Sequence, residues 1–280
     1  DETPIKAGLS KNNKTKAKMH QGYYWPLYGE DDEVVFTYSD SRARRVIEQI
    51  LSQSFTGTLV SDGYSAYALY AQANDKVTHA QCWVHTRRKF IEAENDEPAA
   101  VAEIVQQIQA LYEHQAHIAD KGLTSEKKRD YRFEHSKPVV DAIFEWVDEQ
   151  RQRLDLVPQS PFAKALGYIV ERETELRVFL SDPDVPLDTN HLERAIRPIP
   201  MGRRNWLFAW TELGAQHVGI IQSLISTCRL HSVNPYIYLT DVLQRVQIHP
   251  DRDIIELTPR VWKTKFADHP MRSDLNLVDQ

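Results

Sequence analysis

Three acidic residues stand where a folded chain could bring carboxylates to the edge of a sheet. Asp1 lies in or beside a first predicted strand, Asp62 ends the apolar run TLVSD, and Glu193 lies in the first turns of a late predicted helix. Open α/β sheets bind ligands at the carboxyl ends of their strands, which is where Asp62 is expected. Carboxylates that hold two divalent ions ~3.5–4 Å apart can support phosphoryl transfer, because the ions assist the attacking and the leaving oxygen.

Each acid also has a simpler interpretation, and the 40 acidic residues of the chain offer many such triples. Asp62 precedes Gly63 and is equally expected as the first residue of an Asp-Gly turn. Glu193 can be the partner in a capping box whose N-cap is Thr189 or Asn190. The spacing of the acids alone leaves both interpretations open.

Basic residues gather in local patches although the chain has a net charge of −6. That net charge argues against a protein that coats DNA indiscriminately. Local patches are compatible with a phosphate backbone contacted at chosen points, and they are also common on ordinary protein surfaces. The candidate DNA-binding residues are Arg87, Arg88, Lys89, Arg194, Arg197, Arg203 and Arg204.

Four of these arginines follow Glu193 closely, the last two after a predicted turn at Gly202. A guanidinium group suits bidentate contact with a phosphate, so their position favours a nucleic-acid backbone beside the acid. Trp206 opens the run NWLFAW, which predicts a short strand or hairpin arm. Its ring could stack on an unpaired base, but a place in the core is the favoured interpretation.

The two cysteines, Cys82 and Cys228, cannot form a disulfide framework, and a reducing compartment is the simplest interpretation. Cys82 and His85 have the spacing of half a zinc site. A closed site would need distant histidines, so we predict a buried strand end that leads into a helix, and no zinc. His79 and His85 could line the edge of an active site, although a structural role is more usual.

Composition and missing motifs exclude several other classes of protein. Of the 280 residues, 41% are hydrophobic and 26% charged, which is typical of a globular protein. No run of 18 apolar residues predicts a membrane span. No glycine-rich phosphate loop and no nucleophile elbow is present, which argues against ATP-dependent enzymes and common hydrolases. The start DETPIKAGLS has neither a Met nor a signal-peptide pattern, so a fragment or a processed chain is expected.

The elements that would position the acids change character along the chain. Aromatic and β-branched residues predict three strands at the start. A helix, a strand that ends at Asp62, a short helical stretch and a further strand come next. Apolar residues then recur at helical spacing from Pro98 to Leu180, which predicts three or four helices, one capped by Ser160. A helix from about Thr189 should end before Pro198, and a later helix should begin at the cap Asn234.

Four segments together carry a resemblance to a known family. DETP, LVSDGYSAY, HAQCWVHTRRKF and NHLERAIRPIPMGRRNWLFAWTELGA closely resemble the transposases of the insertion sequence 66 family, in order from Asp1 to about His249. The resemblance implies an α/β fold with an RNase H-like mixed sheet, flanking helices and a DDE triad. Asp1, Asp62 and Glu193 would be the catalytic residues and the ligands of two Mg²⁺ ions, for which Mn²⁺ could substitute.

The resemblance also implies a division of the chain. Asp62 and Glu193 are 131 positions apart, far more than a bare RNase H-like core needs. Residues 1–95 would begin the catalytic core, and residues 96–182 would form a helical insertion between its last strand and the catalytic helix. Residues 183–249 would complete the core and add C-terminal helices, and residues 250–280 would form a tail. We expect the insertion to project near the active edge of the sheet.

The expected function is cleavage of DNA at element ends and transfer of the cut strand into target DNA. Element ends and target DNA are the expected partners, with a homo-oligomer in a synaptic complex and accessory proteins of the element. A prokaryotic cytoplasm, with association with the nucleoid during activity, is the expected location. The alternatives are an RNase H-like nuclease or resolvase that never joins strands, and an inactive DNA-binding or assembly fragment.

Overall fold

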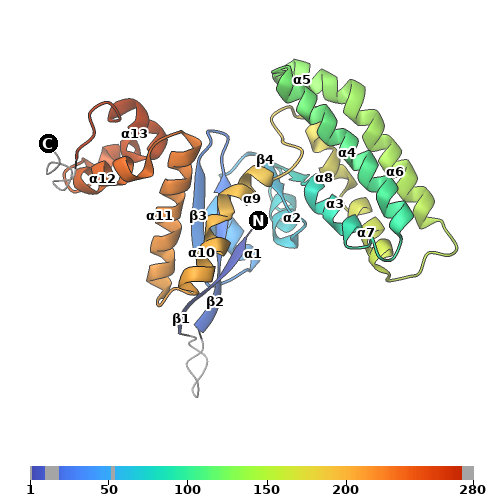
Figure 1. Ribbon diagram of the computed structural model, residues 1–280, viewed down its shortest axis with the longest axis horizontal. Helices are drawn as coiled ribbons and strands as arrows, with labels where there is room; N and C mark the ends of the chain where they lie inside the picture. The colour runs from blue at the N-terminus through green and yellow to red at the C-terminus, as the bar shows by residue number, and fades with distance from the viewer. Residues whose placement is uncertain (1, 10–18, 52–53, 273–280) are drawn as a thin grey trace. The chain divides into compact units, whose positions relative to one another are not determined.

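The computed structural model describes residues 2–9, 19–51 and 54–272 (Figure 1). The chain divides into two compact units. The first, called the sheet unit, combines Asp1–Arg42 with Leu192–Gln280; the second, called the helical unit, is the continuous stretch Ala43–His191. Among the described residues, no helix has the length and apolar character needed to cross a lipid bilayer.

The sheet unit is built on three antiparallel strands in the order β1-β2-β3. β1 spans Thr3–Leu9, β2 spans Met19–Tyr28 and β3 spans Val34–Ser39, so the three strands predicted at the start of the chain are confirmed. Buried apolar side chains from all three strands form one core with residues of the later helices. The N-terminal and C-terminal segments of the chain therefore fold together.

Helix α11, Glu212–Leu230, lies along β3 and closes this edge of the sheet (Figure 1). The backbone N–H of Phe36 donates to the Ser223 hydroxyl at 2.8 Å, and that of Val34 donates to the Thr227 hydroxyl at 3.1 Å. A Cβ at Gly219 would lie 2.6 Å from the Phe36 carbonyl oxygen, so only glycine permits this approach. Helix hydroxyls thus satisfy strand groups that a bare edge would expose.

The end of the chain forms a second small core in the sheet unit. It contains α12 (Pro235–Arg245), a 3₁₀-helix over Asp251–Leu257 and α13 (Pro259–Lys265). The predicted cap is confirmed, because the Asn234 side chain accepts from the second and third residues of α12. Cys228, Tyr238 and Trp262 are buried together here. Part of the stretch 250–280, where the sequence shows no clear pattern, is therefore packed structure.

The helical unit contains a parallel pair of strands near its start. β4 spans Gly57–Ser61 and β5 spans Val77–Gln81, with Ser61 opposite Gln81. Three helices accompany them: α1 over Arg44–Leu51, α2 over Ser65–Gln72 and α3 over Trp83–Ile91. The α/β class is confirmed, with the described strands in two small sheets; the single RNase H-like sheet stays a prediction.

The rest of the helical unit is mainly helical, as the apolar spacing predicts, but it contains five described α-helices and a π-helix where three or four helices were expected. Ser160 caps α7, because its hydroxyl accepts from Ala163 N at 3.1 Å. The core runs without interruption from β5 and α3 into these helices, with Trp83, Phe90, Val147 and Phe162 in one cluster. The elements are α4 (Pro98–Asp120), α5 (Ser125–Tyr131), a π-helix (Arg132–Ser136), α6 (Lys137–Arg151), α7 (Pro161–Val170) and α8 (Glu173–Ser181).

A buried arginine fastens the helices to the segment after α8. Arg132 is fully buried, and its Nη1 donates to the carbonyl oxygens of Phe179 at 2.8 Å and Val185 at 3.0 Å. Its Nη2 donates to Gln115 Oε1 at 2.9 Å. Burial lowers the pKa of Arg132 to about 10, which leaves it charged at neutral pH. Without this arginine, the carbonyl groups of Phe179 and Val185 would lose their buried donor.

Candidate active site

Asp62 directly follows β4, at the carboxyl end of the parallel strand pair. Its Oδ1 accepts from the backbone N–H of Tyr64 at 3.0 Å, and its backbone carbonyl accepts from the Ser61 hydroxyl at 2.9 Å. The side chain is half-buried. The predicted Asp-Gly turn is confirmed, and it presents the carboxylate at the end of the strand where α/β sheets bind ligands.

A histidine from the neighbouring strand supports this turn. His79 Nε2 lies 2.8 Å from the Ser61 hydroxyl, so β5 is tied to the residue before Asp62. Burial lowers the pKa of His79, while the charges of Glu175 and Asp62 act in the opposite direction. A neutral imidazole at the edge of the site is the consequence. The sequence suggested His79 as a residue at the edge of an active site, and the structure places it beside the turn that carries Asp62.

Two residues of the helical region also reach Asp62's turn, and sequence reasoning missed both. The Arg172 guanidinium lies 3.9 Å from the centroid of the Tyr168 ring, and its Nη2 donates to the Gly63 carbonyl at 3.4 Å. A Cβ at Gly63 would overlap the Tyr168 ring and hydroxyl. Tyr168 lies on α7, whereas Arg172 lies in the turn between α7 and α8, and no local sequence pattern indicates that the two meet the turn of Asp62.

Cys82, the first residue after β5, is buried and bonds to Thr189. Thr189 donates to its Sγ from the backbone N at 3.3 Å and from Oγ1 at 3.4 Å. Burial raises the pKa of Cys82, but hydrogen bonds from His85 and Thr189 outweigh it and leave the pKa below its ordinary value. The pKa of His85 is raised, because its interaction with Cys82 outweighs burial. The predicted buried strand end that leads into a helix is confirmed.

Glu193 lies on α9, Asn190–Ile196, and is half-buried. Before this helix, the Asp188 carboxylate accepts from Asn190 N at 2.9 Å and Asn190 Nδ2 at 2.6 Å. The Thr189 hydroxyl donates to Cys82, so both predicted N-cap side chains have partners outside the helix. A role for Glu193 in a capping box stays an alternative.

The convergence of the three acids stays a prediction. Asp1 lies outside the described residues, directly before β1. Asp62 belongs to the helical unit and Glu193 to the sheet unit. Within the described residues, no group of three or more His, Cys, Asp or Glu side chains is placed to hold a metal ion. The predicted set takes one member from outside this range and one from each unit.

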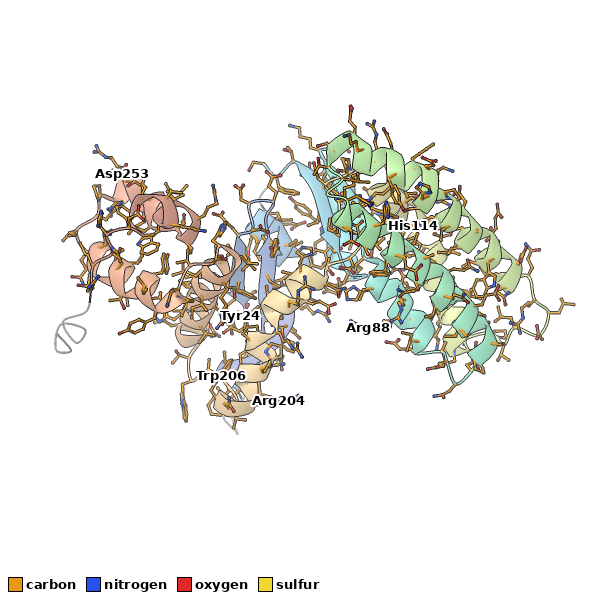
Figure 2. The ribbon with its side chains drawn as sticks, turned by 45° about the horizontal axis from the view of Figure 1, so that its top comes forward. Tyr24, Arg88, His114, Arg204, Trp206 and Asp253 are labelled. Carbon is orange, nitrogen blue, oxygen red and sulfur yellow. The ribbon has the colours of Figure 1, made fainter. Side chains whose placement is uncertain are left out.

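The seven candidate DNA-binding residues lie on three helices and the link between two of them. Arg87, Arg88 and Lys89 belong to α3, where Lys89 also pairs with Glu92 at 2.8 Å. Figure 2 shows Arg88 on this helix. Arg194 and Arg197 are exposed, the first on α9 and the second directly after it. DNA contact by these residues stays a prediction.

Two expectations for the segment after α9 are wrong. Residues Pro198–Trp206 form a helix, α10, so Arg203 and Arg204 do not follow a turn at Gly202. Prolines are tolerated in the first turn of a helix because their missing N–H has no helical partner there. NWLFAW forms no strand beyond a single bridge between Ala209 and Ala7.

Trp206 was expected in the core, and this is also wrong. It ends α10 with 39% of its surface exposed, and Figure 2 shows it near Arg204 at this helix end. Its ring lies over Gly202, where a Cβ would collide with it. Arg203 is half-buried and donates to the Pro4 carbonyl, so it also fastens α10 to β1.

Comparison with known proteins decides the family. A family model described as Transposase IS66 family matches residues 1–217, and one described as IS66 C-terminal element matches residues 223–260. The chain belongs to the IS66 transposase family. Family membership confirms the resemblance carried by the four sequence segments. No solved structure matches the chain.

Three proteins of Sinorhizobium fredii, each described as uncharacterized, are similar to this IS66 family chain. The protein y4hP is 32% identical over 258 residues, which cover 86% of this chain and 46% of y4hP. The protein y4qI is 29% identical over 282 residues, covering 95% of this chain and 50% of y4qI. The protein y4jD is 31% identical over 220 residues, which cover 76% of this chain and 42% of y4jD. The chain thus spans about half the length of the curated relatives it matches.

Proposed function

We propose that this chain is the catalytic part of a cut-and-paste DNA transposase. The observation that carries the proposal is the family match over residues 1–217, which includes all three predicted acids. The position of Asp62 supports it, because the residue follows a parallel strand and projects from an Asp-Gly turn. Three antiparallel strands followed by a helix, a strand, a helix and a parallel strand are the order expected of an RNase H-like core.

In this proposal Asp1, Asp62 and Glu193 are the ligands of two Mg²⁺ ions, for which Mn²⁺ can substitute. The donor chemistry fits, because carboxylate oxygens are the ligands that Mg²⁺ prefers. Asp62 retains capacity for a ligand: among the described residues only Tyr64 N donates to its carboxylate. When bound, the ions supply positive charge beside the reacting phosphate and lower the pKa of the attacking water.

The proposed reaction is two successive in-line displacements at phosphorus. In the first, a water oxygen attacks the phosphodiester at the element end and the bond to the 3′ oxygen breaks. The water gives up a proton to solvent, and the released 3′ oxygen gains one. In the second, this 3′-hydroxyl loses its proton, attacks a phosphodiester of the target, and displaces a target 3′ oxygen that is protonated in turn. The total number of phosphodiester bonds is unchanged in the second step.

The chain's own residues would orient the DNA for these displacements. Exposed guanidinium groups at Arg194, Arg197 and Arg204 can each form paired hydrogen bonds with phosphate oxygens. Arg87, Arg88 and Lys89 would contact the backbone from α3. Positioning is a large part of catalysis in such reactions, because it replaces an encounter in solution with a fixed geometry. A homo-oligomer that pairs two element ends, accessory proteins of the element and action at the nucleoid complete the proposal.

The test is an assay of the 280-residue chain with a labelled duplex from one end of its encoding element, a plasmid target and Mg²⁺. Cleavage followed by joining of the label to the plasmid is the expected result. Cleavage without joining would indicate an RNase H-like nuclease or resolvase. No cleavage in Mg²⁺ or Mn²⁺, with DNA binding retained, would indicate a DNA-binding or assembly fragment.

A further inference from the structure

Three hydrogen bonds hold residues 187–189 to the junction between β5 and α3. The backbone N–H of Trp83 donates to the Leu187 carbonyl at 3.1 Å. Thr189 donates to Cys82 Sγ twice, from its backbone N at 3.3 Å and from Oγ1 at 3.4 Å. Cys82 and Thr189 are 1% and 3% exposed, so water does not compete for these bonds. We call the two bonds to sulfur the Cys82–Thr189 clasp.

The clasp joins two segments that matter for the proposed site. On one side, Cys82 directly follows Gln81, which pairs across the parallel strands with Ser61, the residue before Asp62. On the other side, Thr189 directly precedes α9, the helix that carries Glu193. Only four positions separate Thr189 from Glu193, about one helical turn. The segment from which α9 starts is therefore fixed to the strand pair that presents Asp62.

We propose that Cys82 is a positioning residue for Glu193, which it serves by holding Thr189 at the start of α9. The proposal rests on the proposed function, because the clasp matters for catalysis only if Glu193 is a metal ligand. Residues that support metal ligands without touching the metal commonly change metal affinity or activity ~10–100-fold when they are mutated. A small shift at the start of α9 would displace the Glu193 carboxylate, and so would weaken its hold on the metal ion.

The sulfur is suited to this role by its electrostatic environment. The pKa of Cys82 lies below its ordinary value, because hydrogen bonds from His85 and Thr189 to the sulfur outweigh the effect of burial. A charged acceptor forms stronger hydrogen bonds than a neutral thiol. The single sulfur atom accepts from both donors of Thr189, the backbone N and Oγ1.

The simpler interpretation is that Cys82 is a small buried hydrophobic residue, as free cysteines often are. The chain contains a matched control for it. Cys228 is also fully buried, packs among Tyr238 and Trp262, and its side chain has no hydrogen bond to any described residue. Substitution of either cysteine by alanine removes one buried sulfur, but only Cys82→Ala removes the acceptor for Thr189.

The first experiment compares Mg²⁺-dependent cleavage by Cys82→Ala and Cys228→Ala in the 280-residue chain. For Cys82→Ala we expect a rate ~10–100-fold lower and a higher Mg²⁺ concentration for half-maximal rate. Cys228→Ala should keep the wild-type Mg²⁺ dependence. Cys82→Ser, which restores an acceptor, should recover part of the loss. A wild-type rate and Mg²⁺ dependence for Cys82→Ala would overturn the proposal, as would equal losses in both alanine variants.

The second experiment needs no catalysis. Binding of Mn²⁺ to the DNA-free chain is measured by electron paramagnetic resonance, and exchange of the Thr189 amide hydrogen by mass spectrometry. In Cys82→Ala we expect weaker Mn²⁺ binding and faster exchange at Thr189, with neither change in Cys228→Ala. Unchanged Mn²⁺ binding in Cys82→Ala would overturn the positioning role. A wild-type chain that binds Mn²⁺ but never cleaves DNA would instead count against the proposed function alone.

Discussion

Asp241 and Asp62 are both aspartates with a fixed side chain, and their surroundings differ in kind. Asp241 is fully buried, and each of its oxygens accepts two hydrogen bonds. Arg245 donates to both oxygens, Trp262 Nε1 to Oδ1 and Met271 N to Oδ2. Asp62 is half-buried, and within the described residues its carboxylate accepts from Tyr64 N alone.

The difference separates a structural carboxylate from one that can take a ligand. A carboxylate whose lone pairs are all used has nothing left for a metal ion, and its loss would leave buried donors without partners. A carboxylate fixed at one oxygen has a defined orientation and a free second oxygen. Family membership alone does not distinguish these roles, whereas the hydrogen bonds of each acid do.

The largest expected effect tests the Asp62 side of the comparison. Asp62→Asn should reduce Mg²⁺-dependent DNA cleavage by about 10³-fold or more, because the amide cannot supply the charge that a metal ligand needs. The fold should keep its stability, since the Asn side-chain oxygen can still accept from Tyr64 N. Cleavage rates and thermal unfolding are measured together. A variant that cuts DNA as fast as the wild type would make Asp62 a turn residue only.

Glu193→Gln should likewise abolish metal-dependent cleavage while the fold remains almost as stable. Glutamine can replace glutamate in a capping box, and losing a cap would cost only ~0.5–2 kcal/mol. If the three acids converge as proposed, removal of one charge should raise the thermal stability of the metal-free protein slightly. The measurement is cleavage of a labelled element end in Mg²⁺ or Mn²⁺. Ordinary activity would return Glu193 to the role of a simple cap.

Asp241→Asn should show the opposite pattern, with a loss of stability of about 3–5 kcal/mol, because Arg245 is left without its charged partner in a buried site. Urea unfolding measures the loss. Asp253→Asn is the matched control: Asp253, labelled in Figure 2, pairs at 3.3 Å with Arg252, whose side chain is 86% exposed. Such surface pairs contribute ~0–1 kcal/mol. Equal stability of the two variants would refute the structural role of Asp241.

The smallest expected effect is a dependence of stability on acid pH. Burial raises the pKa of Asp241, but hydrogen bonds from Arg245 and Trp262 outweigh it and leave the pKa below its ordinary value. The stabilisation is therefore complete above the unfolded-state pKa of about 3.9, and is lost as pH falls through the folded-state value. Unfolding free energies measured from about pH 6 to pH 2 should fall more steeply below pH ~4 in the wild type than in Asp241→Asn. Parallel curves would contradict this.

Local features of the fold were predictable because their causes are local. Ser160 and Asn234 cap helices through side chains that bond within three residues. The Asp62 turn forms for the same reason. The prolines before Trp206 led to the wrong prediction of a turn, because Pro198 follows the end of α9 and is the first residue of α10. The sequence marks a break at this proline, but it does not show that a second helix begins there.

Contacts between distant residues could not be predicted. Arg172 and Tyr168 meet the turn at Gly63 across more than a hundred residues, and their nearness in sequence does not reveal this contact. The exposure of Trp206 depends on which elements cover α10. The bond from Thr189 to Cys82 joins residues 107 positions apart, and a motif that suggests zinc gives no indication of it.

The discontinuity of the sheet unit has a consequence for the order in which the chain folds during synthesis. Tyr24 donates to the Ala215 carbonyl and Val34 N to the Thr227 hydroxyl, across 191 and 193 positions. Translation must therefore pass through all of Ala43–His191 before α11 can cover β3. We expect the continuous helical unit to become protease-resistant on the ribosome before the sheet does, which pulse proteolysis of stalled chains can measure. Until then the aromatic and aliphatic face of the first strands is a surface for chaperones to shield from aggregation.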